Sequence, residues 1–221
     1  MLSRTLLIAS LVVPLGHSVQ GRRIVAIELG ASNARTAVLV VGCIHGNEPA
    51  GIAIAGALER VRPPQGVALW IVPDLNPDGV AANTRHNADD VDLNRNFPAG
   101  WRPQTGIYDS GARPLSEPES QIAYRLILRI RPRVTIWFHQ HLDVVDSSTG
   151  DITLLRRFAA VAGERLQPLT RYGGSAVTWE NARFPGTSPF VVELPAGSLS
   201  AAAVQRYVRA VLAVASLVAA R

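Results

Sequence analysis

The chain has 221 residues, of which 48% are hydrophobic and 18% are charged, and its formal net charge is +5. This is enough for one large domain with its own core, too short for two ordinary domains and a linker, and too apolar for a disordered chain. All 22 basic residues are arginine, which excludes Schiff-base chemistry and a Walker-type phosphate lysine. The arginines are spread along the whole chain instead of forming one basic stripe, so we expect no nucleic-acid partner.

The first 15 residues differ from the rest of the chain. Arg4 is followed by an apolar run from Leu6 to Leu15, which is too short to span a bilayer but has the size of a signal peptide. A small-x-small pattern at 16–18 would serve as a cleavage site. We therefore treat 1–15 as a signal-like segment, with a buried strand as the alternative, and 16–221 as the catalytic domain. Export to the cell envelope is slightly favoured over a cytoplasmic location, and no stable membrane span is expected.

Strands alternate with helices along the remainder of the chain. Apolar and β-branched runs predict a strand pair at 23–29 and 36–41, with further strands at 67–72, 134–138 and 190–192. Helical periodicity predicts helices at 50–61, near 154–166 and after Ser200, and the Ser116 and Glu119 pattern predicts a capped helix running to about 130. This alternation predicts an α/β protein, a single three-layer α/β/α domain with a central mixed, mostly parallel sheet.

Polar side chains follow three of these strands at the point where each strand ends. His45 and Glu48 come after strand 36–41, His139 ends strand 134–138, and Glu193 ends strand 190–192. In open α/β sheets ligands bind beyond the carboxyl ends of the strands, so parallel neighbours would bring these four side chains into one crevice. Two imidazoles and one carboxylate can hold zinc with a fourth position open to water. The remaining carboxylate, Glu193, is then the candidate base. The single cysteine, Cys43, is flanked by apolar residues and is expected to be a buried, inert thiol.

The same residues belong to a longer series of motifs. The series runs through GHSVQGR at 16–22, HGNE at 45–48, NPDG at 76–79, DLNRNF at 92–97, FH at 138–139 and FVVELP at 190–195. In this order, over nearly the whole chain, it resembles the zinc carboxypeptidases of the carboxypeptidase A type. Within them it looks most like the bacterial branch that contains the murein peptide amidases, which cut a γ-D-glutamyl link to diaminopimelate.

The resemblance implies a metal centre and an activity. One zinc ion per chain would be held by His45, Glu48 and His139, and Glu193 would activate the zinc-bound water and then protonate the leaving amine. The implied reaction is hydrolysis of a C-terminal amide bond in a short peptide, with a murein peptide as one candidate substrate. The sequence leaves the oligomeric state open.

Four further positions match the family's substrate site. Arg85 stands where the family has the arginine that stabilises the oxyanion, and Asn94 with Arg95 matches the pair that grips a substrate carboxylate. Asp92 matches the carboxylate that orients the first zinc histidine. These roles come from the resemblance, because an arginine considered alone is as often a solvated surface charge.

Two positions depart from the family pattern. Tyr172 lies closer to the following glycines than the family's mobile tyrosine does, and we do not assign it a catalytic role. His141 stands where the murein amidase branch tends to have proline; it is interpreted as a polar residue on the cleft rim, with a competing or supporting metal contact as the alternative. The chain is also short for this family, which predicts reduced loops and an open cleft.

Two other functions remain open at this point. N-acyl amino acid deacylases of the aspartoacylase and succinylglutamate desuccinylase type share the His-Gly-Asn-Glu turn, but the full motif at 92–97 and the segment at 116–119 favour the peptidase branch. A catalytically inactive peptide-binding protein on the same fold is the second alternative. The presence of the three ligands and of Glu193 argues against it.

Overall fold

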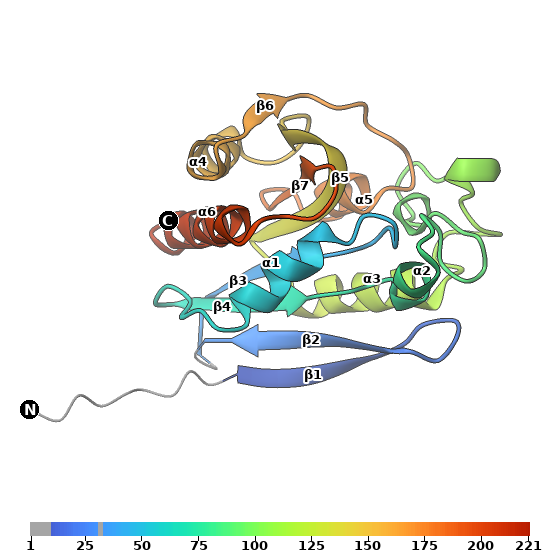
Figure 1. Cartoon of the computed structure of the whole chain (residues 1–221), viewed down its shortest axis with the longest axis horizontal. Helices are drawn as coiled ribbons and strands as arrows, with labels where there is room; N and C mark the ends of the chain where they lie inside the picture. The colour runs from blue at the N-terminus through green and yellow to red at the C-terminus, as the bar shows by residue number, and fades with distance from the viewer. Residues whose placement is uncertain (1–9, 31–32) are drawn as a thin grey trace, which may run out of the picture.

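A seven-stranded sheet runs through the molecule from an N-terminal hairpin at one edge to a short strand at the other (Figure 1). The computed structural model describes residues 10–30 and 33–221. The order along the sheet is β1-β2-β4-β3-β5-β6, and β7 pairs with β5. β1 and β2 are antiparallel to their neighbours, whereas β3, β4, β5 and β7 are paired in parallel. The strands are β1 (Ser10–His17), β2 (Arg23–Leu29), β3 (Thr36–Val41), β4 (Val67–Val72), β5 (Val134–Asp146), β6 (Arg165–Gln167) and β7 (Ser188–Pro195).

Strand β5 pairs with β7 twice. Its first half runs beside β7 with His139 opposite Glu193 and His141 opposite Pro195. The partner numbers then run backwards, so that Val144 also lies opposite Glu193, and the last residues of β5 pair with β6. The chain reverses at Asp143, which has a positive φ of 57°. β7 is therefore enclosed between the two halves of β5.

Helices cover both faces of the sheet and create two cores. The first core contains Leu58, Phe158 and Val211 and lies under α1 (Ala50–Leu58), α4 (Ile152–Ala162) and α6 (Ala201–Ala219). The second contains Leu126 and Trp179 and lies under α3 (Pro118–Ile130) and α5 (Ala176–Arg183). The remaining helical segments are α2 (Pro77–Ala82) and the 3-10 turns η1 (Leu93–Arg95) and η2 (Gly106–Tyr108). Both faces are covered, so the predicted three-layer domain with a mixed, mostly parallel sheet is confirmed.

Local predictions differ from the structure at several points. The strands at 23–29 and 36–41 form, but β4 lies between them. The predicted helix at 154–166 ends at Ala162 because Gly163 adopts the left-handed conformation, with φ 75°, and the next residues form β6. The predicted capping box is wrong, since α3 begins after Glu117 without a side-chain cap.

The N-terminal segment is only partly described. Residues 10–15, part of the predicted signal-like segment, lie in the edge strand β1, and residues 1–9 fall outside the described residues. At the other end, α6 is long and apolar enough to cross a membrane by length and composition, but half of its most apolar window is buried. Tyr207 and Val214 of α6 are fully buried in the first core, so we assign α6 to the core of the domain.

One carboxyl group lies in the second core, away from the strand ends. Glu180 of α5 is 0% exposed and accepts a hydrogen bond from the Thr135 hydroxyl of β5. Its other oxygen has no partner among the described residues. Burial raises the pKa of Glu180 to about 8, because the charged form would lose its hydration in the core.

This buried carboxyl predicts a pH dependence of stability. The unfolded chain releases the proton near the ordinary pKa of 4.5, whereas folded Glu180 keeps it until about pH 8. The free energy of unfolding should therefore fall between these values, by at most about 1.4 kcal/mol per pH unit. Glu180→Gln should remove this component, as measured by denaturant unfolding from pH 5 to 8. The exposed Glu59→Gln is the control, and parallel curves for wild type and Glu180→Gln would contradict the prediction.

Candidate active site

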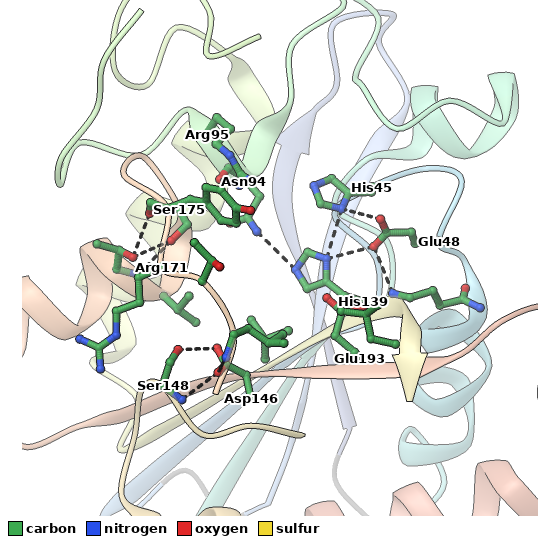
Figure 2. Close-up of a pocket in the computed structure, with 18 of the residues that line it drawn as sticks. His45, Glu48, Asn94, Arg95, His139, Asp146, Ser148, Arg171, Ser175 and Glu193 are labelled. Atoms are coloured by element: carbon green, nitrogen blue, oxygen red, sulfur yellow. Dashed lines mark hydrogen bonds and ion pairs between the residues drawn. The ribbon is translucent and has the colours of Figure 1, made fainter. Parts of the chain in front are cut away.

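Three potential metal ligands meet beyond the end of β3 and beside the middle of β5. His45 and Glu48 lie in the turn between β3 and α1, and His139 is in β5. The Nδ1 atoms of the two histidines are 3.2 Å apart, and each lies 3.0 Å from an oxygen of Glu48 (Figure 2). One ligand atom from each residue lies within 4.8 Å of the other two. Two imidazole nitrogens and a carboxylate in this arrangement fit a single zinc ion with room for a further ligand, so the residues could hold one metal ion as predicted.

Asp92 fixes the orientation of one member of this cluster, His45. One of its oxygens lies 2.9 Å from His45 Nε2 and also accepts a hydrogen bond from the backbone N–H of Asn94. The other accepts two hydrogen bonds from the Arg85 guanidinium, at 3.0 and 2.9 Å. Since an ionised carboxylate only accepts, His45 carries a proton on Nε2, and Nδ1, which faces Glu48, is the atom that would bind a metal after losing its own proton.

The charges of the cluster stabilise one another. Burial alone would raise the pKa of Glu48, but the charge of His45 and hydrogen bonds from both histidines outweigh it and hold the pKa well below its ordinary value. Burial opposes charge on Asp92 in the same way, and His45 with Arg85 lowers the pKa of that carboxyl strongly. Arg85 also donates to Glu48 at 3.1 Å. Both carboxyl groups are therefore held in the ionised form that a cation requires.

Glu193 lies next to this cluster on β7. It is directly opposite His139 in the parallel register, and cross-strand partners share a face of the sheet. Its Oε2 atom is buried and has no hydrogen-bond partner in the described part of the chain. Glu193 and the three potential ligands line the same cavity of about 380 Å³. One carboxylate oxygen beside the cluster is thus free to take a proton.

Another wall of the cavity presents an arginine that contacts two aromatic rings, which stack on each other. Arg95 follows Asp92 in η1 and is 4% exposed. Its guanidinium carbon lies 4.9 Å from the centre of the Tyr108 ring and 4.3 Å from that of Tyr172. Asn94 lies beside it, with its amide nitrogen 3.5 Å from His139 Nε2. The stacking fixes a positive charge at the cavity wall.

The structure also places the two residues that departed from the family pattern. Tyr172 is 43% exposed and stacks on Tyr108 and Arg95, so its contacts are with the arginine and not with the potential ligands. His141 is exposed and lies at the cavity edge, outside the His45, Glu48 and His139 group. The prediction that His141 lies on the rim agrees with this position.

Sequence reasoning did not find Gln140. Its side-chain amide donates to the carbonyls of Pro195 and Gly197, and its oxygen accepts from the N–H of Ala50. Its own backbone N–H donates to Glu48. Gln140 thus joins the middle of β5 and the end of β7 to the start of α1. Gln140 stands between two histidines, which drew the functional interpretation of this segment. Its long-range contacts follow no local sequence pattern, so they could not be predicted.

Close backbone contacts support the turn that carries His45 and Glu48. A Cβ atom on Gly46 would lie 1.9 Å from the carbonyl carbon of Gly79 in α2. Asn76 caps α2 and also donates from its side chain to the carbonyl of Ile44. The HGNE and NPDG motifs are therefore in direct contact, which explains the glycine at position 46. At position 79 a Cβ atom would instead meet the Asn76 side chain and the carbonyl of His86.

Comparison with known proteins agrees with this geometry. The sequence model of the zinc carboxypeptidase family matches residues 64–175, which is half of the chain. The chain belongs to the zinc carboxypeptidase family. The matched range contains Arg85, Asp92, Arg95 and His139, whereas His45, Glu48 and Glu193 lie outside it and are connected to it by the sheet register.

The chain is also similar to individual members of this family and to solved structures. Murein peptide amidase A of Escherichia coli K12 is 30% identical over 145 residues, covering 59% of this chain and 60% of that protein. The chain thus matches less than two thirds of this relative's length. The crystal structure of a murein-tripeptide amidase from Escherichia coli O157 superposes with a TM-score of 0.77 at 26% identity, covering 93% of this chain and 91% of that chain. The γ-D-glutamyl-L-diamino acid endopeptidase 1 of Lysinibacillus sphaericus is 30% identical over 177 residues, 59% of this chain and 43% of that protein.

The contact between the two glycine turns generates a prediction. Gly46→Ala should push the His45 turn away from α2, destabilise the protein by about 1–3 kcal/mol through overpacking, and weaken zinc binding. Gly56→Ala is the matched control, because its Cβ meets nothing within 4 Å inside α1 and should stabilise by about 0.5–1 kcal/mol. Thermal unfolding and zinc titration measure both effects. Unchanged stability and zinc affinity in Gly46→Ala would refute the contact.

Proposed function

We propose that this chain is a zinc-dependent peptide hydrolase that cleaves the amide bond before a C-terminal residue of a short peptide. The observation that supports it most is the convergence of four groups in one cavity: the three potential ligands and the unpartnered oxygen of Glu193. Bound zinc would act as a Lewis acid and acidify a water molecule so that it can attack at neutral pH. The other steps fall to side chains of this chain.

Glu193 moves the proton. Its free oxygen accepts a proton from the attacking water and then passes it to the nitrogen of the leaving amine, so that water is consumed and an acid and an amine are released. Arg85, which also donates to Glu48, stabilises the oxyanion that forms when the water attacks the carbonyl carbon. Because Asp92 holds two of its nitrogens, the guanidinium keeps a fixed direction, and such a donor beside a developing oxyanion is typically worth about 2.7–4 kcal/mol.

Arg95 and Asn94 select the end of the peptide. A guanidinium offers two parallel donors to a carboxylate, and contacts with the stacked rings of Tyr108 and Tyr172 restrict the movement of this one. The buried Arg95 Nε has no partner among the described residues, which leaves donor capacity at this wall. A free carboxylate bound here would direct the adjoining amide bond towards Glu193.

The substrate that we propose is a bacterial cell-wall peptide. The support comes from the relatives, two of which are named as murein amidases and a third as a γ-D-glutamyl-diamino acid endopeptidase. A substrate panel on zinc-loaded and chelated protein tests the choice. Cleavage of a murein tripeptide should exceed that of C-terminal hydrophobic dipeptides and of N-acylaspartate. Preferential action on N-acylaspartate would instead indicate a deacylase, and tight peptide binding without turnover an inactive binding protein.

The assignment of Glu193 and His139 can be separated by metal analysis. Glu193→Gln should keep about one zinc per chain while kcat falls by roughly 10²- to 10⁴-fold, because only proton transfer is lost. His139→Ala should lose both the tightly bound zinc and the activity. Elemental analysis and steady-state kinetics on the same samples measure the two effects. A near-normal rate in Glu193→Gln would show that the assigned base is wrong.

The role of Arg95 predicts a different kinetic signature. Arg95→Ala should raise KM by about 10- to 100-fold with a smaller fall in kcat, since it removes a charged hydrogen bond already made to the bound substrate. Arg209→Ala on the exposed side of α6 serves as the control for loss of one positive charge. A pure kcat defect in Arg95→Ala would refute carboxylate binding at this position.

A further inference from the structure

The loop between α2 and η1 carries Arg85 and Asp92, and it closes on Asn87. The backbone N–H of Asn87 donates to the carbonyl of Val91 at 3.0 Å. Its side-chain oxygen accepts from the backbone N–H groups of Asp89 and Val91, at 3.2 and 3.1 Å. This turn brings the two ends of the loop together, so that Arg85 and Asp92 can form the two hydrogen bonds that join them.

The side-chain amide of Asn87 also ties this turn to α3. Its nitrogen donates to Glu117 at 2.7 Å and to Glu119 at 3.1 Å, and all three residues are buried. The other oxygen of Glu119 accepts from the backbone N–H of Val19, in the turn between β1 and β2, at 3.0 Å. One amide group therefore holds the loop of Arg85 against the start of α3.

The two glutamates explain why position 87 needs an amide. Neither of them makes an ion pair within residues 10–30 and 33–221, so both carboxyl groups depend on the two hydrogens of one NH2 group. Burial raises the pKa of Glu119, and the charge of Glu117 adds to this shift. A carboxylate at position 87 would have the same shape, but it would donate to neither glutamate and would repel both.

The direction of the Arg85 side chain depends on this loop. Its hydrogen bonds run to Asp92, at the far end of the same loop, and to Glu48. The side chain is 20% exposed, so close packing does not hold it in place by itself. A shift of about 1 Å in a group that acts on the reacting atoms can lower a rate by about 100-fold. Contacts that fix the loop are therefore expected to affect the reaction.

We propose that Asn87 is a positioning residue for Arg85: by tying the loop to α3, it directs the guanidinium towards the oxyanion. The inference rests on the proposed function, in which Arg85 stabilises that oxyanion. It also gives a role to two sequence segments to which the proposed function assigns none. The motif at 16–22 and the segment at 116–119 both contribute contacts to the support of this loop.

The kinetics of Asn87→Asp test this role. In zinc-loaded protein acting on a murein tripeptide, kcat should fall by about 10- to 100-fold while KM stays within about 3-fold, because the transition state loses more than the bound substrate. Zinc should stay at about one per chain. Asn83→Asp, the same change at an exposed position at the start of the loop, is the matched control and should keep the wild-type kcat. A near-normal kcat in Asn87→Asp, or loss of its zinc, would overturn the proposal.

A double-mutant cycle separates positioning from a structural role. If Asn87 acts through Arg85, then Asn87→Asp should lower kcat by less than about 3-fold once Arg85→Ala has removed the guanidinium, because residues that act together have non-additive effects. A general loosening of the fold would lower kcat by the same factor in both backgrounds. Such an additive result would contradict the proposal.

Exchanging the two partners should rescue the loop. In Asn87→Asp combined with Glu117→Gln, the new amide can donate to the new carboxylate and the net charge returns to that of the wild type. Its kcat should be at least about 3-fold higher than that of Asn87→Asp, and no recovery would count against the proposal. If Asn87→Asp does not fold, Asn87→Ser replaces it in the cycle, because a serine hydroxyl can still accept from the loop but is too short to reach the glutamates.

A measurement on Arg85 itself keeps this inference separate from the proposed activity. In protein labelled with ¹⁵N-arginine, the Nε–H signal that is absent from Arg85→Ala reports the hydrogen exchange of the group bonded to Asp92. This exchange should be at least about 10-fold faster in Asn87→Asp than in the wild type. If it is faster although the wild type hydrolyses no peptide, positioning by Asn87 is supported and the hydrolase is refuted. Turnover by the wild type with unchanged exchange in Asn87→Asp would overturn this inference alone.

Discussion

The carboxylate of Asp92 is the contact on which the arrangement of the site depends. It accepts from the His45 ring, from the Arg85 guanidinium and from the Asn94 backbone, and it is completely buried. Removing one partner from such a buried charge typically costs 3–5 kcal/mol, on the order of a large part of a domain's stability. The loop that follows α2 and the turn that follows β3 are therefore stable only together. One side chain thus positions the potential metal ligand His45, the proposed oxyanion donor Arg85 and the start of the wall that we propose to bind a carboxylate.

The core of the site could be predicted from polar residues at the ends of predicted strands, because each strand end is visible as a short-range pattern in the sequence. Each of the strands 36–41, 134–138 and 190–192 is a compact apolar run, and the residue type at its end is visible in the sequence. Whether the three ends meet depends on sheet order, which the alternation of strands and helices restricts strongly. The structure brings His45, Glu48 and His139 together, with Glu193 opposite His139. The roles of these residues in catalysis remain proposals.

Features that depend on long-range pairing could not be predicted in this way. The apolar run at 134–138 predicts a strand that ends at His139, and nothing local shows that the chain continues, reverses at Asp143 and pairs with β7 again. The contacts of Gln140, the stacking of Tyr108 and Tyr172 on Arg95, and the contacts of Asn87 all require that pairing or equally distant loops. At Gly163 the error was different, because helical periodicity continued past a residue whose left-handed conformation ends the helix.

The enclosure of β7 by the two halves of β5 has a consequence for how such enzymes can diversify. A strand that is hydrogen-bonded along both edges cannot shift without breaking hydrogen bonds on each side. The position of Glu193 on β7 is therefore little affected by changes in the surrounding loops. The segment 168–171, by contrast, follows β6 and ends before Tyr172, which contacts Arg95, so its length and composition can change without breaking either ladder of β7. Evolution or an engineer could thus retune which molecules are accepted by altering that segment, while the reactive groups keep their mutual spacing.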